Sequence, residues 1–171
     1  MGKSDMSRPY ILIVDDEKEI TDELSATISE TQKYRVIAAN SAHDALHALK
    51  KHNGRFSPRD GRIRLVLLDI KMPEMNGLEL AEKIKHDYGG REDTIGLMLL
   101  TAYEDKEKWH KAIEYHVVAY LRKPYKSEEL LKKIERYFSA DLEAPYMMVS
   151  DTIEEGIDRM EKMRQEESEN G

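Results

Sequence analysis

The sequence predicts an α/β protein built on a doubly wound, five-stranded parallel sheet. Short apolar runs alternate five times with segments of helical periodicity, and each run is nearly continuous rather than apolar at every second position. Strict alternation of this kind is typical of a parallel sheet with helices on both faces. Continuous apolar strands are typical of strands buried on both sides.

The elements follow one another in a regular order. The predicted strands are 10–14, 34–39, 63–68, 95–100 and 117–121. Each precedes a helix whose apolar stripe recurs every three or four residues, beginning in turn at Ile20, Ala42, Leu78, Trp109 and Leu130. Ser41 is a predicted N-cap, with Asp44 three residues on, and Ser127 begins the fifth helix. His43 and His47 have metal-ligand spacing, but they lie off the apolar stripe, and a solvated helix face is the better interpretation.

Composition excludes several classes of protein. The 171 residues include no cysteine, which rules out disulfides, thiolate metal sites and cysteine nucleophiles. No apolar run is long enough to cross a bilayer, so a cytoplasmic protein without membrane contact is expected. The net charge of −7 lies entirely in residues 139–171, which carry 10 acidic and 3 basic side chains. An acidic tail and the absence of a basic stripe disfavour direct binding of nucleic acid.

Reactive side chains follow the predicted strands. Asp15 and Asp16 follow the first strand, Asp69 the third, Thr101 the fourth and Lys123 the fifth. In open α/β sheets, ligands bind outside the carboxyl ends of the strands. We therefore expect these five groups to emerge at one edge of the sheet.

Their chemistry predicts a phosphoryl site with a hard metal ion. Crowded carboxylates repel one another unless a cation lies between them. Oxygen ligands without histidine or cysteine select Mg²⁺, Ca²⁺ or Mn²⁺ over zinc. An ammonium group and a hydroxyl suit the charge of a phosphoryl group in transfer, and a carboxylate is an adequate nucleophile for phosphorus.

Four segments together resemble the receiver domain of two-component response regulators, of the chemotaxis-regulator kind, over roughly residues 8–138. They are residues 14–17 (VDDE), 68–77 (LDIKMPEMNG), 100–102 (LTA) and 119–124 (AYLRKP). Any one of these motifs is weak, but the ordered set is specific. The resemblance implies a flavodoxin-like strand order 2-1-3-4-5 and the domain boundaries 8–138 and 139–171. It also implies a signalling switch with self-phosphorylation and autodephosphorylation chemistry rather than an enzyme.

The resemblance implies a role for each site residue. Asp69 would accept phosphate from a histidine kinase or a phosphotransfer protein. Asp15, Asp16 and Asp69, with the backbone carbonyl of Lys71, would hold Mg²⁺, for which Mn²⁺ can substitute. Lys123 and Thr101 would contact the phosphoryl oxygens, and Thr101 with Tyr120 would form the switch. Lys71 and Tyr103 would tune the site, with Tyr103 shielding the acyl phosphate for minutes or longer.

Simpler interpretations exist for each residue. Asp15 and Asp16 are also suited to capping a helix, as is Thr101 before the fourth helix, and Tyr120 to a plain strand position. An aspartyl-phosphate phosphatase would place two aspartates two apart after the first strand, and a flavin-binding protein would need a Ser/Thr/Gly-rich loop there. The pair Asp15-Asp16 fits neither, and a phosphorylation-independent adaptor would not need the full set. The chain is alternatively the N-terminal receiver of a larger regulator.

The tail departs from a minimal receiver. Ala144-Pro145 is expected to break the chain after the fifth helix, and a further helix is expected from Asp151, with Ile153, Ile157 and Met160 on one face. The chain beyond Gln165 is expected to fray. This helix is expected to dock on its own domain or to contact a second copy, and a disordered tail is the alternative. The resemblance implies that phosphorylation shifts the fourth helix, fifth strand and fifth helix and so controls protein–protein contacts, including homodimerisation.

Overall fold

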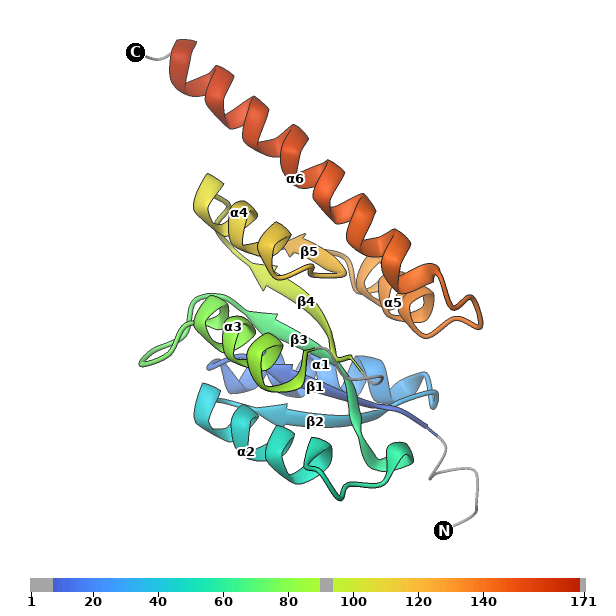
Figure 1. Ribbon diagram of the computed structural model, residues 1–171. Helices are drawn as coiled ribbons and strands as arrows, with labels where there is room; N and C mark the ends of the chain where they lie inside the picture. Colours follow the sequence, from blue (N-terminus) through green and yellow to red (C-terminus); the bar gives the residue numbers. More distant parts are fainter. Residues whose placement is uncertain (1–7, 90–93, 170–171) are drawn as a thin grey trace. The chain divides into compact units, whose positions relative to one another are not determined.

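A computed structural model describes residues 8–89 and 94–169 (Figure 1). The chain divides into two compact units, residues up to Leu97 and residues from Met98. The strands form one five-stranded sheet in the order β2-β1-β3-β4-β5. Strand β1 pairs in parallel with β2 and β3, and β4 pairs in parallel with β5. The predicted fold class and strand order are confirmed.

The first unit holds three strands and three α-helices. Its elements are β1 (Tyr10–Val14), α1 (Lys18–Glu30), β2 (Arg35–Ala39), α2 (Ala42–Asn53), the 3-10 helix η1 (Arg59–Gly61), β3 (Ile63–Asp69) and α3 (Gly77–Tyr88). The central strands β1 and β3 are buried, as their continuous apolar sequences predict. Helices α1 and α2 pack on this part of the sheet, and β1 has a strand on each side.

Local sequence determines where these helices begin. The Ser41 hydroxyl accepts a hydrogen bond from the Asp44 N–H at 3.0 Å and caps α2, as predicted. Leu24 and Ile28 of α1 are buried on the apolar stripe. His43 and His47 are both exposed, which confirms a solvated helix face.

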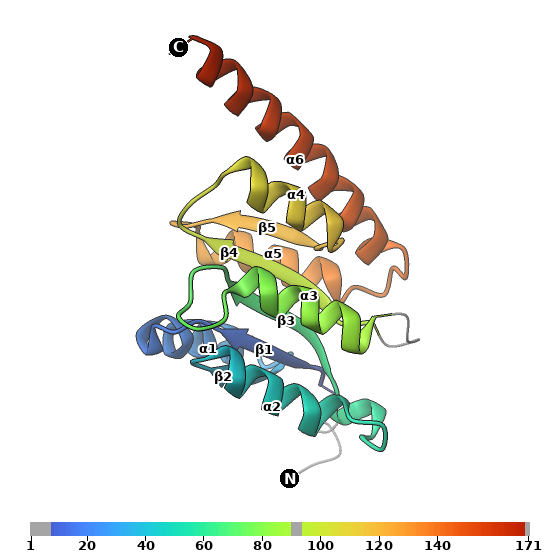
Figure 2. The ribbon, with the colours of Figure 1, turned by 60° about the vertical axis from the view of Figure 1, so that its left-hand side comes forward.

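The second unit contains the remaining elements. They are β4 (Gly96–Thr101, which begins two residues before Met98), α4 (Lys106–Glu114), β5 (Ala119–Arg122), α5 (Ser127–Tyr137) and α6 (Ala144–Glu169). Trp109 of α4 is completely buried. In Figure 2 and in Figure 1 alike, α6 runs beside α4, and it also contacts β5 and α5.

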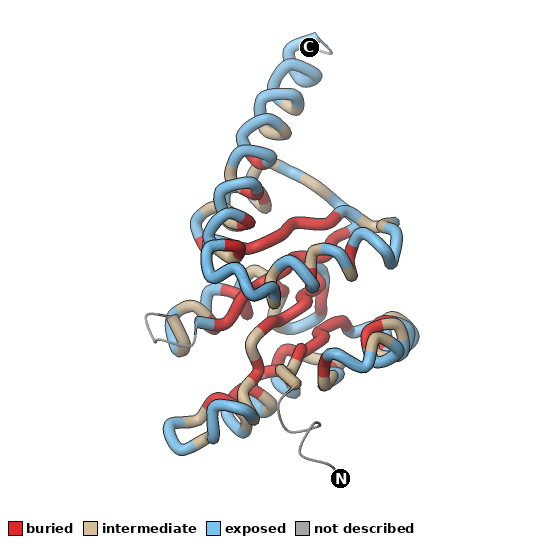
Figure 3. The backbone as a smooth tube through the Cα atoms, turned by 90° about the vertical axis from the view of Figure 1, so that its right-hand side faces the viewer, coloured by how far each residue is buried: buried red, intermediate tan, exposed pale blue. Residues whose placement is uncertain are grey.

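Helix α6 corrects the predictions for the tail. It begins at Ala144 and continues to Glu169, so neither the break at Ala144-Pro145 nor the N-cap at Asp151 is right. Pro145 lies in the first turn, where a helix needs no N–H from it. The buried residues are Ala144, Met148, Thr152 and Gly156 instead of Ile153 and Ile157. The chain stays helical beyond Gln165, where Figure 3 shows the last turns exposed.

Within the described ranges, none of the helices combines the length and apolar character needed to cross a membrane.

Candidate functional site

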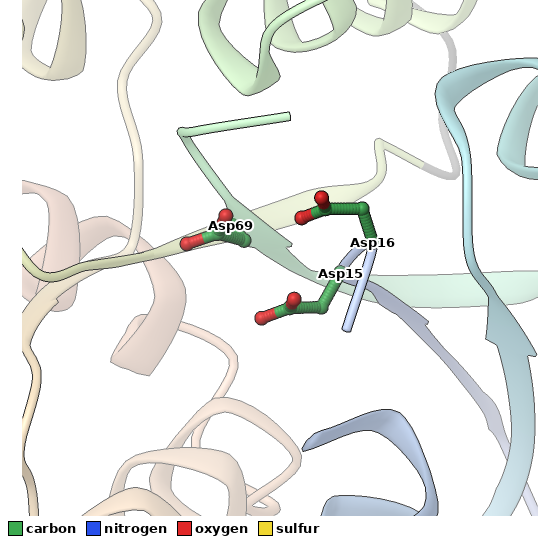
Figure 4. Close-up of side chains that lie close together, drawn as sticks. All are labelled: Asp15, Asp16 and Asp69. Atoms are coloured by element: carbon green, nitrogen blue, oxygen red, sulfur yellow. The ribbon is translucent and has the colours of Figure 1, made fainter. Parts of the chain in front are cut away.

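Three carboxylates meet at the ends of two paired strands in the first unit (Figure 4). One carboxylate oxygen from each of Asp15, Asp16 and Asp69 lies within 4.8 Å of the others. The pairing of Val14 with Leu68 explains this, because Asp15 and Asp69 are the next residues of adjacent parallel strands. Asp15 and Asp69 are buried and Asp16 is exposed. The predicted acidic cluster is therefore present, with one side open to solvent.

Backbone and side-chain hydrogen bonds hold Asp15 in place. Its Oδ1 accepts the Glu17 N–H at 2.9 Å, and its own N–H donates to the Ala39 carbonyl at 3.2 Å. The Asn40 amide donates to the Asp15 carbonyl and to the Thr21 hydroxyl, both at 2.9 Å. Sequence reasoning missed Asn40. Its position directly after β2, at the same sheet edge, was the available signal.

A tight turn positions Asp69. The Gly77 N–H donates to the Ile70 carbonyl at 2.8 Å, which brings the start of α3 back against the end of β3. A Cβ on Gly77 would lie 2.1 Å from the Asp69 carbonyl oxygen, so only glycine fits. Asn76 and Glu79 form a capping box that fixes the first turn of α3. Glu74, in the segment between β3 and α3, has a positive φ of 66°.

The donor set fits a hard divalent cation. All three groups offer oxygen, and their mutual repulsion favours a positive ion between them. Mg²⁺ takes one or two carboxylates and keeps water or phosphate oxygens in its other positions. Exposed Asp16 leaves room for such ligands. Lys71, whose side chain is exposed, follows two residues after Asp69.

In the second unit, Thr101 and Lys123 lie at the ends of paired strands. Thr101 is opposite Arg122 in the β4–β5 ladder, and the Lys123 N–H donates to the Thr101 carbonyl at 2.6 Å. The buried Thr101 hydroxyl donates to the Tyr103 carbonyl at 3.0 Å and accepts the Tyr103 N–H at 3.2 Å. The Lys123–Pro124 peptide bond is cis. Thr101 does not cap α4, because that helix begins with Asp105 as its N-cap.

Tyr120 stacks on Trp109. Their ring centroids are 4.0 Å apart with an interplanar angle of 20°. Burial raises the pKa of the Tyr120 phenol well above its ordinary value, and the nearby carboxylates of Glu104 and Asp105 raise it further. Within the described residues, the Tyr120 hydroxyl and the Trp109 Nε1 are buried without a hydrogen-bond partner. The Tyr120 phenol therefore lies in an unfavourable environment.

Comparison with known protein families decides what kind of domain carries this site. The family described as the response regulator receiver domain matches residues 11–135. The chain belongs to this family. The receiver domain assignment agrees with the parallel sheet order and with the place of the acidic cluster.

Proteins from distant organisms are similar to this chain. The transcriptional regulatory protein CpxR homolog of Haemophilus influenzae is 32% identical over 125 residues, which are 73% of this chain and 48% of that protein. A probable cyclic di-GMP phosphodiesterase of Vibrio cholerae is 36% identical over 124 residues, 72% of this chain and 25% of that protein. The CheY-like response regulator receiver domain protein of Methanospirillum hungatei is 28% identical, with a TM-score of 0.63, covering 87% of this chain and 99% of that one. The chain spans less than half the length of the first curated relatives that it matches.

Replacing Tyr120 with phenylalanine tests the unpartnered phenol of this receiver. At pH 7 we expect Tyr120→Phe to leave the free energy of unfolding unchanged or to raise it by about 1 kcal/mol, because no hydrogen bond of the hydroxyl is lost. The pKa of Tyr120 is raised in the folded protein, so the neutral phenol stabilises the fold at low pH. Wild type should lose stability relative to the variant as the pH rises past about 10, the ordinary tyrosine value.

Urea unfolding at pH 7 and at about pH 10.5, which lie on either side of that value, measures both effects. A loss of more than about 2 kcal/mol at pH 7 would show that the hydroxyl has a partner.

Proposed function

We propose that this receiver domain is a phosphorylation-dependent switch of a two-component phosphorelay. Asp69 accepts a phosphoryl group from a histidine kinase or a phosphotransfer protein. The observation that supports this most strongly is the cluster of Asp15, Asp16 and Asp69 in a chain of the receiver family. The cytoplasm, where such donors act, is the proposed location.

The transfer assigns a task to each group. An Asp69 carboxylate oxygen forms a bond to phosphorus while the bond from phosphorus to the donor histidine nitrogen breaks, and the nitrogen keeps the electron pair. Asp15 and Asp16, together with Asp69 and the Lys71 carbonyl, would hold Mg²⁺ or Mn²⁺. When bound, the ion supplies positive charge to the phosphoryl oxygens. Lys123 contributes an ammonium group and Thr101 a hydroxyl to the same oxygens.

The proposed output is a change in protein contacts. Thr101 would leave its two bonds to Tyr103 in order to bond a phosphoryl oxygen, and Tyr120 would move with it. Both residues belong to the unit that contains α4, β5 and α5, so this surface would carry the signal to a partner protein or to a second copy. Exposed Tyr103 would slow hydrolysis of the acyl phosphate. We take residues 8–138 as the receiver and residues 139–171 as an extension of it.

Phosphorylation of Asp69 can be measured directly. With acetyl phosphate and Mg²⁺, we expect wild type to gain one base-labile acyl phosphate by intact mass, and Asp69→Asn to gain none. Asp158→Asn, which changes an exposed carboxylate on α6, is the matched control and should behave as wild type. If wild type gains no phosphate, or if Asp69→Asn gains as much as wild type, the proposal is wrong.

A further inference from the structure

Helix α6 lies directly on the indole ring of Trp109. Its buried residues, Ala144, Met148, Thr152 and Gly156, recur at every fourth position. A Cβ added to Gly156 would lie 2.8 Å from Trp109 Cε3 and 3.2 Å from Ile113 Cδ1. The helix backbone is therefore as close to α4 as glycine allows, and a larger side chain would force α6 away.

The same indole ring contacts the switch tyrosine. Trp109 stacks on Tyr120 with ring centroids 4.0 Å apart, and it is completely buried. Trp109 Nε1 and the Tyr120 hydroxyl have no hydrogen-bond partner among the described residues. A movement that gives either polar group a hydrogen-bond partner is favourable. The two side chains are therefore suited to adopt a second conformation. Any such movement of Tyr120 changes the packing of the Trp109 ring, against which Gly156 lies.

A second connection reaches α6 from the segment after Thr101. The Glu104 carboxylate, whose side chain is 8% exposed, lies 3.0 Å from Arg159 of α6 and 3.6 Å from Arg122 of β5. Glu104 is three residues beyond Thr101, whose hydroxyl holds the backbone of Tyr103 through two hydrogen bonds. When the hydroxyl leaves those bonds, the segment that positions Glu104 loses its constraint. Arg159 then loses a fixed partner.

The two halves of α6 are attached differently. The half up to Gly156 has buried apolar contacts, whereas the half beyond it is held by the Arg159–Glu104 and Lys106–Glu167 ion pairs. A cavity of about 590 Å³ opens here, lined by both the segment after β4 and the last turns of α6. The Lys106–Glu167 pair is largely exposed and stabilises the contact by at most about 1 kcal/mol. When Arg159 separates, the buried Glu104 carboxylate still has Arg122 as a partner. The C-terminal half is therefore the part that can separate at small cost.

We propose that α6 is a releasable cover of the surface formed by α4 and β5, and that phosphorylation of Asp69 releases it. This inference rests on the proposed function. The unmodified protein keeps α6 docked through Gly156 on Trp109 and Arg159 on Glu104. In the phosphorylated protein, the changes at Thr101 and Tyr120 weaken both contacts, and the surface of α4 and β5 becomes accessible.

Amide hydrogen exchange in the 171-residue chain tests the release. The probe is BeF₃⁻ with Mg²⁺, which mimics an acyl phosphate. In wild type we expect exchange in residues 157–167 to become at least about 5-fold faster when BeF₃⁻ binds, the lower end of usual coupling between sites. Asp69→Asn should show no change. Acrylamide quenching of Trp109, the only tryptophan, should increase in parallel.

Variants of α6 provide the reciprocal test. Gly156→Leu should give fast exchange and accessible Trp109 without BeF₃⁻, and linkage requires it to bind BeF₃⁻ more tightly by the same factor. Glu154→Leu, which adds the same side chain on the exposed face, is the matched control and should leave both properties unchanged. Arg159 lies outside the buried stripe of α6. Arg159→Ala should also speed exchange in α6 and tighten BeF₃⁻ binding, by a smaller factor than Gly156→Leu.

The outcomes separate the two proposals. If BeF₃⁻ binds but exchange in α6 stays the same, the coupling is wrong and the phosphorylation site stands. If Gly156→Leu and Arg159→Ala free α6 without tightening BeF₃⁻ binding, α6 is a structural helix only. If wild type binds no BeF₃⁻ in the presence of Mg²⁺, the proposed function and the coupling are both wrong.

Discussion

Gly77→Ala is expected to destabilise the protein by about 3 kcal/mol or more, a large effect for one methyl group. The added Cβ would lie 2.1 Å from the Asp69 carbonyl oxygen and 2.8 Å from the Ile70 Cα. Both atoms belong to the backbone, so no flexible side chain can move aside. Either β3 or the start of α3 must shift, and the hydrogen bond from the Gly77 N–H to the Ile70 carbonyl is then lost.

Urea unfolding of Gly77→Ala beside Gly61→Ala measures this effect. A Cβ on Gly61 would meet only the Pro58 side chain, at 3.6 Å, so this control should stay within about 0.5 kcal/mol of wild type. Because the shift acts on the residue that carries the carboxylate, the folded variant should also take up acetyl phosphate more slowly. Equal midpoints for the two variants would contradict the close approach of Gly77 to Asp69.

The strands and the acidic cluster were predictable because their signals are local. Continuous apolar runs mark buried parallel strands, and the rule that ligands bind at strand ends selects the residues that follow. Asp15, Asp16 and Asp69 meet as that rule requires. The roles of Asn40 and of Gly77, which was only part of the motif 68–77, were not predicted, because an amide after a strand and a glycine in a turn have many other uses. Only the fold shows that one bonds Asp15 and the other touches Asp69.

The tail could not be predicted from local signals. Pro145 and Gly156 both lower helix propensity, and propensity alone favours a later start and a shorter helix. Tertiary packing overrides it, because Gly156 is the residue that allows α6 to approach Trp109. Ile153 and Ile157 have helical spacing, yet the smaller residues Thr152 and Gly156 are the buried ones. The Glu104–Arg159 ion pair joins residues 55 apart, and nothing near either residue indicates the other.

The three carboxylates should make the metal-free protein less stable than it would be with two. Asp16→Asn removes one charge from a cluster whose oxygens lie within 4.8 Å of one another. Two charges about 4 Å apart repel by about 1 kcal/mol in water and by more in partly buried sites. Since Asp16 is the exposed member, we expect the free energy of unfolding without metal to rise by about 1 kcal/mol.

The same substitution should remove most of the response to Mg²⁺. A ligand at about 100 times its dissociation constant stabilises a protein by about 2.7 kcal/mol, which sets the scale for wild type. With one carboxylate fewer, Mg²⁺ affinity should fall at least about tenfold, and phosphate uptake should fall with it. Melting curves with EDTA and with Mg²⁺ measure the stability without metal and the stabilisation by the ion. Glu23→Gln, which changes an exposed carboxylate of α1 outside the cluster, is the control.

A particular combination of results identifies the cluster as a metal site. Asp16→Asn should be more stable than wild type in EDTA and less stable than wild type in Mg²⁺, because the charge that opposes folding without the ion is the charge that binds it. A residue with a purely structural role would shift stability in the same direction in both buffers. If Asp16→Asn responds to Mg²⁺ as strongly as wild type, then Asp16 does not hold the ion. Asp15 and Asp69, the two buried carboxylates, would then be its only carboxylate ligands from this cluster.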